Sequence, residues 1–318
     1  MTPADLELTP GKPPILPVSE PVAAAEWVGE YRALLTEVLL RHGAVLVRGL
    51  GVRDAALLGQ LSAQLMESTV MDREAFARRH PLGNSVFSSL EWPPDQPMCM
   101  HHEQSYLLEV PRLLAIGCFA APDSGGITGL ADAEAVLAEL PEPLVARFAE
   151  TGWTLRRSFN DVVGLPWREA FGGDDREAAE KYCQANRITC DWRPDGLRTS
   201  QTRPAVLDHP LTGRPVWCNQ IAFLNEWTMD PAVREYLVMQ LGADGLPFNT
   251  GYGDGEPVDA ETIRTINEVY ESLTLREPWQ AGDLLLVDNV RMAHSREPYQ
   301  GRREIGMVQG DPAPTPRG

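Results

Sequence analysis

The sequence predicts a mainly β fold with flanking helices, specifically a double-stranded β-helix of the jelly-roll, cupin-like type. Short apolar runs separated by turns dominate the middle and the end of the chain, whereas helical periods lie near the N-terminus and in insertions. Residues suited to holding a metal lie on runs that are far apart in the sequence. The mouth of a jelly-roll barrel can bring such runs together.

The 318 residues are enough for one large domain or two average ones. No internal repeat and no low-complexity linker divides them, so we expect a single domain over residues 21–309. Residues 1–20 are rich in proline and are expected to run extended over the surface. Residues 310–318 also carry several prolines and are expected to form a loose tail.

Helices are predicted where apolar residues recur at three- and four-residue spacing, and strands where short apolar runs are bounded by turn residues. The predicted helices are 21–42, 53–66 with Asp54 in its first turn, 132–140 with Asp132 as its cap, and 259–273. The predicted strands are 43–50, 110–119, 217–223, 282–289 and 301–307. We expect a turn at 123–126 and a largely irregular region over 141–235.

Composition restricts the class of partner. The chain has 28 Lys and Arg residues against 45 Asp and Glu residues, a net charge of −17. Nucleic acid and anionic membrane surfaces would both be repelled, so neither is an expected partner. Five scattered cysteines without a CxxC pair favour a reducing compartment. With no signal peptide and no apolar run near the roughly 20 residues of a membrane span, we expect a cytoplasmic protein.

The motif at 101–106 is the most informative stretch. In an extended segment His101 and Glu103 point to the same face while His102 points to the other. His294, which follows the apolar run 282–289, can provide a third ligand. Two imidazoles and one carboxylate occupy one face of an octahedron and leave three positions open, the arrangement of non-haem Fe(II) oxygenases. The ordinary alternatives are a surface His–Glu pair on an edge strand and a buried structural imidazole at His294.

The open positions fit a 2-oxo acid such as 2-oxoglutarate, which chelates iron at one end and carries a carboxylate at the other. A guanidinium in the segment 301–307 could bind that distal carboxylate. Arg302, Arg303 and Arg296 compete for this role. On a strand Arg302 and Arg303 face opposite ways, so only one of them points into the barrel. Arg296 could instead be a surface charge or a contact to a carboxylate of the substrate.

Together these residues resemble the clavaminate synthase/taurine dioxygenase (TauD/TfdA) family of Fe(II)/2-oxoglutarate enzymes, in particular its SyrP-like branch. The resemblance runs from about residue 26 to residue 307. It rests on ordered blocks at 42–49, 91–96, 101–106, 125–132, 209–213, 217–220, 252–255, 278–283, 288–294 and 298–301, and on Arg303.

The resemblance implies that His101, Glu103 and His294 bind Fe(II), and that Thr128 and Arg303 hold 2-oxoglutarate. It implies a dioxygenase that uses O2 to hydroxylate an unactivated C–H bond and releases succinate and CO2. Members of this branch commonly act on an amino acid that is free, carrier-bound or part of a peptide, in specialised-metabolite pathways such as antibiotic biosynthesis. The chain departs from the usual pattern near the site, at His102, Gln104, Ile127 and Ser295. Glu103 disfavours halogenation, because iron halogenases of the wider superfamily replace this carboxylate with a small residue.

Four further side chains are candidate substrate contacts, and each could equally be an ordinary polar group of the fold. They are Gln104, Arg157, Asn219 and Arg296. His102 is expected to lie behind the ligands or to face the substrate, and Thr128 could simply precede a helix. Two other classes of protein stay open: a cupin-like non-oxidative enzyme using Zn or Mn, and a non-catalytic jelly-roll binding or sensor protein.

Overall fold

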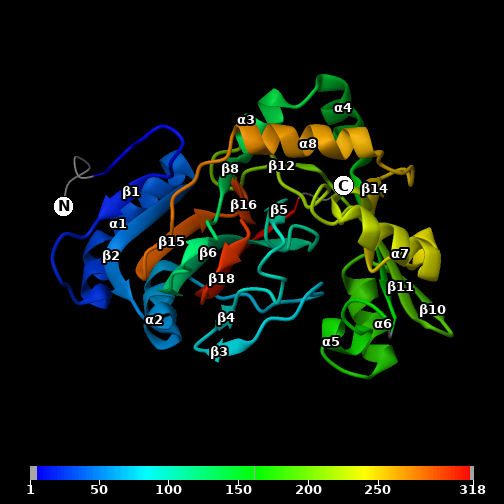
Figure 1. The fold of residues 1–318 in the computed structure, drawn as a ribbon, viewed down its shortest axis with the longest axis horizontal. Coiled ribbons are helices and arrows are strands. Elements are labelled where there is room, and N and C mark those ends of the chain that lie inside the picture. The colour runs from blue at the N-terminus through cyan, green and yellow to red at the C-terminus, as the bar shows by residue number, and fades with distance from the viewer. Residues whose placement is uncertain (1–5, 161, 316–318) are drawn as a thin grey trace.

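A large sheet runs through the centre of the protein (Figure 1), whose structure is a computed structural model describing residues 6–160 and 162–315. Its strand order is β1-β2-β15-β6-β18-β4-β3. The bounds of these strands are β1 Ile15–Pro17, β2 Ala44–Val52, β3 Pro81–Gly83, β4 Val86–Ser88, β6 Glu109–Ala120, β15 Gly282–Asp288 and β18 Glu304–Pro314. The predicted strands at 43–50, 110–119 and 282–289 are therefore confirmed. Among the strands in the described part of the chain only β1 pairs in parallel, with β2; β15 and β18 lie antiparallel on either side of β6.

Two N-terminal helices, α1 (Ala24–His42) and α2 (Ala55–Leu65), pack against one face of this sheet (Figure 1). Apolar residues from both helices and from β2, β6 and β15 share one core. The Asp54 side chain accepts a hydrogen bond from Leu57 N at the start of α2, as predicted. Gly43 ends α1 in the left-handed conformation, with φ of 76°, and lets β2 begin directly.

A three-stranded sheet lies on the other side of the large sheet and carries the residues discussed below. It consists of β5 (Met98–His101), β16 (Met292–Arg296) and β8 (Leu130–Asp132), in the order β5-β16-β8. Apolar residues of β8 and β16 share a core with the inward side chains of β6, β15 and β18. β8 leads into α3 (Ala133–Glu139), whose first turn is capped by Asp132 as predicted. A short pair, β7 (Ser124–Gly125) and β17 (Tyr299–Gln300), replaces part of the expected turn at 123–126.

The segment between α3 and α8 (Ala260–Ser272) is more regular than predicted. It contains a four-stranded sheet in the order β10-β11-β9-β14 and a two-stranded sheet of β12 and β13. The strands are β9 Trp153–Phe159, β10 Thr189–Arg193, β11 Gly196–Arg203, β12 Val206–Asp208, β13 Pro215–Trp217 and β14 Phe248–Tyr252. The helices are α4 Glu142–Thr151, α5 Trp167–Phe171, α6 Arg176–Ala185 and α7 Pro231–Leu241, with short 3₁₀ helices η2 Glu226–Thr228 and η3 Ala243–Gly245. The prediction of an irregular region over 141–235 is wrong.

Three further expectations need correction. The strand predicted over 217–223 ends at Trp217; residues 218–220 form a loop and residues 221–224 a turn. The C-terminal tail is not loose through residue 314, because β18 continues to Pro314 beside β6; residues 316–318 lie outside the described part of the chain. The N-terminal segment is not confined to the surface, because Leu16 is fully buried in the α1–α2 core. None of the helices in the described ranges is both long and apolar enough to cross a membrane.

Candidate metal centre

The register of two short strands places two histidines opposite each other. His101 on β5 and His294 on β16 are direct cross-strand partners, although nearly two hundred residues separate them in the sequence. Their ring centroids lie 4.3 Å apart, and both side chains are almost fully buried. A ligand atom from each of His101, Glu103 and His294 lies within 4.8 Å of the other two. The structure thus brings together the three residues of the predicted ligand set.

Glu103 reaches this position by a different route from the one predicted. β5 ends at His101, and residues 103–106 form a turn rather than an extended segment. The side chain of Asn289, at the end of β15, fixes the turn: its Oδ1 accepts from Glu103 N at 2.7 Å, and its Nδ2 donates to Glu103 O at 2.9 Å. The same Nδ2 donates to Pro111 O at 2.7 Å. One buried amide therefore orients the backbone that presents the carboxylate.

The hydrogen bonds of His101 define its tautomer. Its Nδ1 lies 2.8 Å from Cys99 O, and because a carbonyl oxygen can only accept, Nδ1 carries the proton. Nε2 therefore has a free lone pair. Burial lowers the pKa of His101, and burial together with the neighbouring His101 lowers the pKa of His294 well below its usual range. Both rings are neutral near pH 7, which is the form that binds a metal.

This donor set fits a divalent iron ion. Two neutral imidazoles and a carboxylate converge from one side, as in the facial arrangement of non-haem iron sites. His294 Nδ1 is buried and has no hydrogen-bond partner among the described residues, while its Nε2 lies 3.8 Å from Glu103 Oε2. At 3.8 Å, His294 Nε2 and Glu103 Oε2 are too far apart to hydrogen-bond, so a metal between them would give the Nε2 lone pair a partner.

A buried guanidinium lies behind the carboxylate. Arg79 donates to Glu103 Oε2 at 2.7 Å, and its Nε lies 3.9 Å from Asp72 Oδ2. Arg79 and Glu103 have side chains only 4% and 3% exposed, so this ion pair is held away from water. Gln104 Nε2 completes the cluster by donating to Asp72 Oδ1 at 2.6 Å. Burial raises the pKa of Asp72 above its ordinary value.

A second group of residues forms a polar recess around Arg303. The Arg303 guanidinium donates to Gly126 O at 3.2 Å and lies 3.5 Å from the hydroxyl of Thr128, which also accepts from Trp279 Nε1 at 3.1 Å. Burial, with the positive charge of Arg296, lowers the pKa of Arg303 to about 10. A buried guanidinium without a carboxylate partner among the described residues is suited to binding an anion. Gly126 is needed here, because a Cβ would come within 3.1 Å of Arg303 Cδ.

The other arginines considered in the sequence have different surroundings. Arg302 is 76% exposed and bonds to Glu304, so of the two neighbouring arginines only Arg303 faces inward. Arg296 is buried and donates to the backbone oxygens of 92, 93 and 96, which fixes that loop. Arg157 is buried and donates to the backbone oxygens of 74 and 75.

The side chains of Gln104 and Asn219 also form hydrogen bonds within the protein. Gln104 bonds to Asp72, and its backbone has a positive φ of 52°. Asn219 Nδ2 donates to Ala205 O at 3.1 Å and its Oδ1 accepts from Ile221 N, which shapes the turn after β13. Substrate contact by these two residues, and by Arg157 and Arg296, stays a prediction.

His102 is not part of the cluster of converging ligand atoms. Its Nδ1 lies 2.6 Å from Asn289 O, and it is fully buried. Burial lowers the pKa of His102 to about 4, so the ring is neutral near pH 7. His102 therefore lies behind the ligands and contacts the same residue that orients Glu103.

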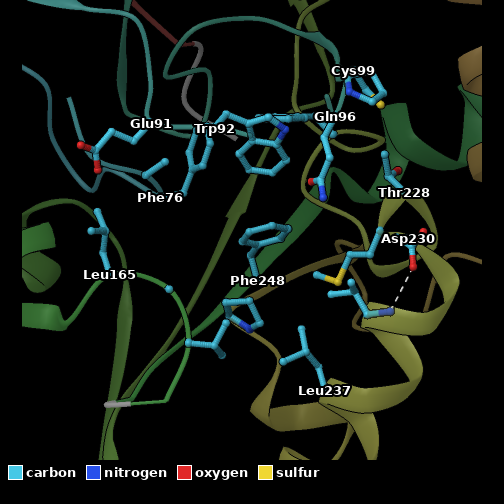
Figure 2. A pocket seen from close by; sticks show the side chains of 18 of the residues that line it. Phe76, Glu91, Trp92, Gln96, Cys99, Leu165, Thr228, Asp230, Leu237 and Phe248 are labelled. Atoms are coloured by element: carbon cyan, nitrogen blue, oxygen red, sulfur yellow. Dashed lines mark hydrogen bonds between the residues drawn. The ribbon is translucent and has the colours of Figure 1, made fainter. Parts of the chain in front are cut away.

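A cavity of ≈690 Å³ adjoins the candidate centre. Phe223 lines the cavity and stacks on the His101 ring, with centroids 4.4 Å apart. Cys99, whose carbonyl holds His101, also lines it, as do residues 76–78 immediately before Arg79. The cavity, part of whose lining is drawn in Figure 2, thus shares Phe223 and Cys99 with the surroundings of His101.

Sequence reasoning did not identify four residues that shape the site: Asn289, Arg79, Phe223 and Trp279. The sequence places Asn289 in the predicted strand 282–289 but does not indicate its role. Nothing in the local pattern around Arg79 or Phe223 distinguishes them from other charged or aromatic residues. Their roles depend on contacts between segments that are remote in the sequence.

Comparison with known proteins agrees with this geometry. The family model described as "Taurine catabolism dioxygenase TauD, TfdA family" matches residues 10–308. The dapdiamide synthesis protein DdaC from Enterobacter agglomerans is 33% identical over 279 residues, covering 87% of this chain and 85% of DdaC. A clavaminate synthase-like protein from Arabidopsis thaliana is 26% identical over 282 residues, covering 85% and 82% of the two chains.

Solved structures show the same fold. PvcB, an Fe, alpha-ketoglutarate dependent oxygenase from an isonitrile synthetic pathway, superposes with a TM-score of 0.56 at 17% identity, covering 96% of this chain and 90% of PvcB. AAD-2, solved in complex with Mn(II) and N-oxalylglycine, gives a TM-score of 0.53 at 13% identity, covering 98% of each chain. The match of the family model to nearly the whole sequence decides the assignment. The chain belongs to the TauD/TfdA family of dioxygenases.

Proposed function

We propose that this chain is an Fe(II)/2-oxoglutarate-dependent oxygenase that hydroxylates an unactivated C–H bond of an amino acid, or of an aminoacyl or peptidyl unit, in a specialised-metabolite pathway. One observation carries the proposal: two neutral imidazoles and the Glu103 carboxylate converge, and the largely buried Arg303 has no carboxylate partner among the described residues. The first feature suits iron and the second suits the far carboxylate of a 2-oxo acid.

Each residue has a defined task in this proposal. His101, Glu103 and His294 would hold Fe(II), and Arg303 and Thr128 would bind the distal carboxylate of 2-oxoglutarate. Iron and 2-oxoglutarate bound together supply the activation of O2 that ends in succinate, CO2 and a hydroxylated substrate. Asn289 holds the Glu103 backbone in place through two reciprocal hydrogen bonds.

The protein also keeps the reaction away from bulk water. The residues His101, Glu103 and His294 are at most 6% exposed, and Phe223 stacks on the His101 ring. Water exclusion protects a reactive intermediate from side reactions and strengthens the electrostatic interactions inside the site. The chain's part in the chemistry is thus to bind, orient and shield.

The relatives support the choice of pathway. DdaC takes part in dapdiamide synthesis, and PvcB is an oxygenase of an isonitrile pathway. We infer a comparable biosynthetic role here, with a small amino-acid-derived substrate and neither nucleic acid nor membrane as a partner. The −17 charge is consistent with this inference, because it opposes binding to polyanions.

We also infer that the large sheet and the β5-β16-β8 sheet form the two walls of a double-stranded β-helix within one domain over residues 21–309. The His101–His294 pairing would then lie between these walls. The five cysteines are free in the structure, which supports a cytoplasmic location for the protein.

The decisive experiment is anaerobic addition of Fe(II) and 2-oxoglutarate, which should produce a weak visible charge-transfer band. Glu103→Ala should abolish succinate formation coupled to substrate oxidation, whereas Glu109→Ala, an exposed change on β6, should leave it intact. A colourless mixture that does not bind 2-oxoglutarate would favour a non-oxidative metalloenzyme or a non-catalytic binding protein. Full coupled turnover in Glu103→Ala would remove Glu103 from the ligand set. Mass spectrometry for a product heavier by one oxygen atom then identifies the substrate.

A further inference from the structure

The cavity beside the candidate centre has a mainly apolar and aromatic lining. Four aromatic rings contribute to it: Phe76, Trp92, Phe223 and Phe248. Figure 2 shows Trp92, Phe76 and Phe248 gathered around the open space, with Leu165 and Leu237 at its sides. Such a lining favours a ligand with an apolar or aromatic side chain, because burying that surface is worth about 25 cal/mol per Å².

The cavity is lined by more acidic than basic side chains. Three carboxylates line it, from Glu91, Asp95 and Asp230, and one cation, Arg78. Glu91 lies 2.6 Å from His80 Nε2 and Asp230 caps α7, so Asp95 is the lining carboxylate without a partner among the described residues. Arg78 is already bound by Glu169 through two hydrogen bonds of 2.8 Å each. The described lining therefore offers no uncommitted cation to an incoming carboxylate.

The arginines behind the cavity also have partners within the protein. Arg79 is paired with Glu103, Arg157 donates to the carbonyls of 74 and 75, and Arg296 donates to those of 92, 93 and 96. Arg303 lacks a carboxylate partner among the described residues, but the proposed function assigns it to 2-oxoglutarate. A free amino acid would thus bring its carboxylate into a site with no cation to receive it.

A neutral hydrogen-bonding group, in contrast, is available. The side chain of Gln96 extends into the open space of the cavity (Figure 2). Its amide can donate to the carbonyl oxygen of an amide, ester or thioester.

We propose that the substrate of this cavity is an aminoacyl unit with an apolar side chain and a free amine, whose carboxyl group is masked as an amide, ester or thioester. The inference rests on the proposed function, which places the reacting C–H bond next to this cavity. An ammonium group is attracted by the negative charge of this lining, and by Asp95 in particular, whereas a carboxylate is repelled by it and loses hydration without gaining a cationic partner. The masked form removes this repulsion and keeps a carbonyl for Gln96.

The first test compares ligands that differ only at the carboxyl group. Phenylalanine, phenylalaninamide, its methyl ester and its N-acetylcysteamine thioester are titrated calorimetrically into the protein loaded with Mn(II) and 2-oxoglutarate. The masked forms should bind roughly tenfold or more tightly than the free acid, a difference of about 1.4 kcal/mol. The order among amide, ester and thioester distinguishes a peptide-like from a carrier-like source. Equal or tighter binding of the free acid would overturn the proposal.

The second test adds a cation to the cavity. Asp95→Arg changes an exposed loop residue and should shift the preference toward the free acid by roughly tenfold. Asp174→Arg makes the same change of net charge at an exposed position between α5 and α6, outside the cavity lining, and should leave the preference unchanged. Equal shifts in both variants would mean that overall charge, and not the cavity, sets the preference.

These outcomes are separable from a failure of the proposed function. Binding of 2-oxoglutarate is measured in the same samples before the ligands are added. If it is absent, the oxygenase assignment fails. If it is present while the free acid binds as tightly as the amide, only the assignment of a masked carboxyl group fails.

Discussion

Replacing Asn289 with alanine tests how the fold presents Glu103. The Asn289 side chain is fully buried and makes three hydrogen bonds with backbone groups, two to Glu103 and one to Pro111. Alanine removes all three and leaves one N–H group and two carbonyl oxygens in the interior without these partners. No charge is changed, so the effect on the site is purely one of positioning.

The expected loss of stability follows from the number of hydrogen bonds that are removed. A buried hydrogen bond contributes about 1 kcal/mol net, so three lost bonds should lower the free energy of unfolding by about 3 kcal/mol. The two histidines keep their cross-strand positions, and only the carboxylate becomes poorly oriented. Loss of an orienting contact of this kind typically weakens metal affinity by about 10- to 100-fold.

Two measurements check these values on the same preparations. Urea denaturation of the metal-free protein gives the change in unfolding free energy, and calorimetric titration with Mn(II) gives the metal affinity. Asn267→Ala, a change on the partly exposed side of α8, is the matched control and should alter neither value appreciably. An Asn289→Ala protein with unchanged metal affinity would refute the positioning role, even if its stability fell.

Three further predictions concern single charged or thiol groups. Arg303→Met should weaken 2-oxoglutarate binding by roughly 10- to 100-fold, because a charge-assisted hydrogen bond contributes about 1.5–3 kcal/mol. Arg302→Met, a change at an exposed side chain, is the control. An equal loss of affinity in both variants would contradict the assignment of Arg303 to 2-oxoglutarate. Arg79→Met should lower the free energy of unfolding of the metal-free protein by about 3 kcal/mol, measured by denaturation, because the buried carboxylates lose their cation. The Mn(II)-loaded protein should lose less stability, because the metal replaces part of the positive charge of Arg79. Cys190 should react with iodoacetamide before Cys99 at pH 8. A hydrogen bond from a neighbouring thiol lowers the pKa of Cys190, whereas burial raises the pKa of Cys99 to about 11. Peptide mapping that shows the reverse order of reaction would contradict this prediction.

The ligand chemistry could be predicted from the sequence because it is local. His101 and Glu103 form a recognisable pair of donors, and the family resemblance selects Arg303, a choice that alternation alone left open between Arg302 and Arg303. The turn that contains Glu103 could not be predicted, because it depends on Asn289, which lies far along the chain. The same is true of Arg79, whose role depends on meeting Glu103 in the interior.

The inserted sheet was missed because its buried face is polar. In β11 the buried positions are Leu197, Thr199, Gln201 and Arg203, so alternation in burial is not alternation in hydrophobicity. β9 likewise buries Arg157, which bonds to the backbone of the segment that passes over the site. A pattern based on apolar residues cannot detect strands of this kind.

The prediction of a loose C-terminal tail is wrong for a different reason. Pro312 and Pro314 suggested irregular chain, but they lie beyond the residues of β18 that pair with β4, which are Gly306 and Met307. Past that point only the β6 side of the ladder is formed by a neighbouring strand, and proline is tolerated where no donor is needed.

The cross-strand pairing of His101 and His294 has a consequence for how the chain assembles. A metal held by both rings ties together segments from the first third and the last tenth of the sequence, and so closes a very long loop. Ions that bind the finished pair, and not the unpaired segments, shift the folding equilibrium by mass action. Iron supply during synthesis would then govern how much of the newly made protein completes its central strands, as well as whether it can turn over.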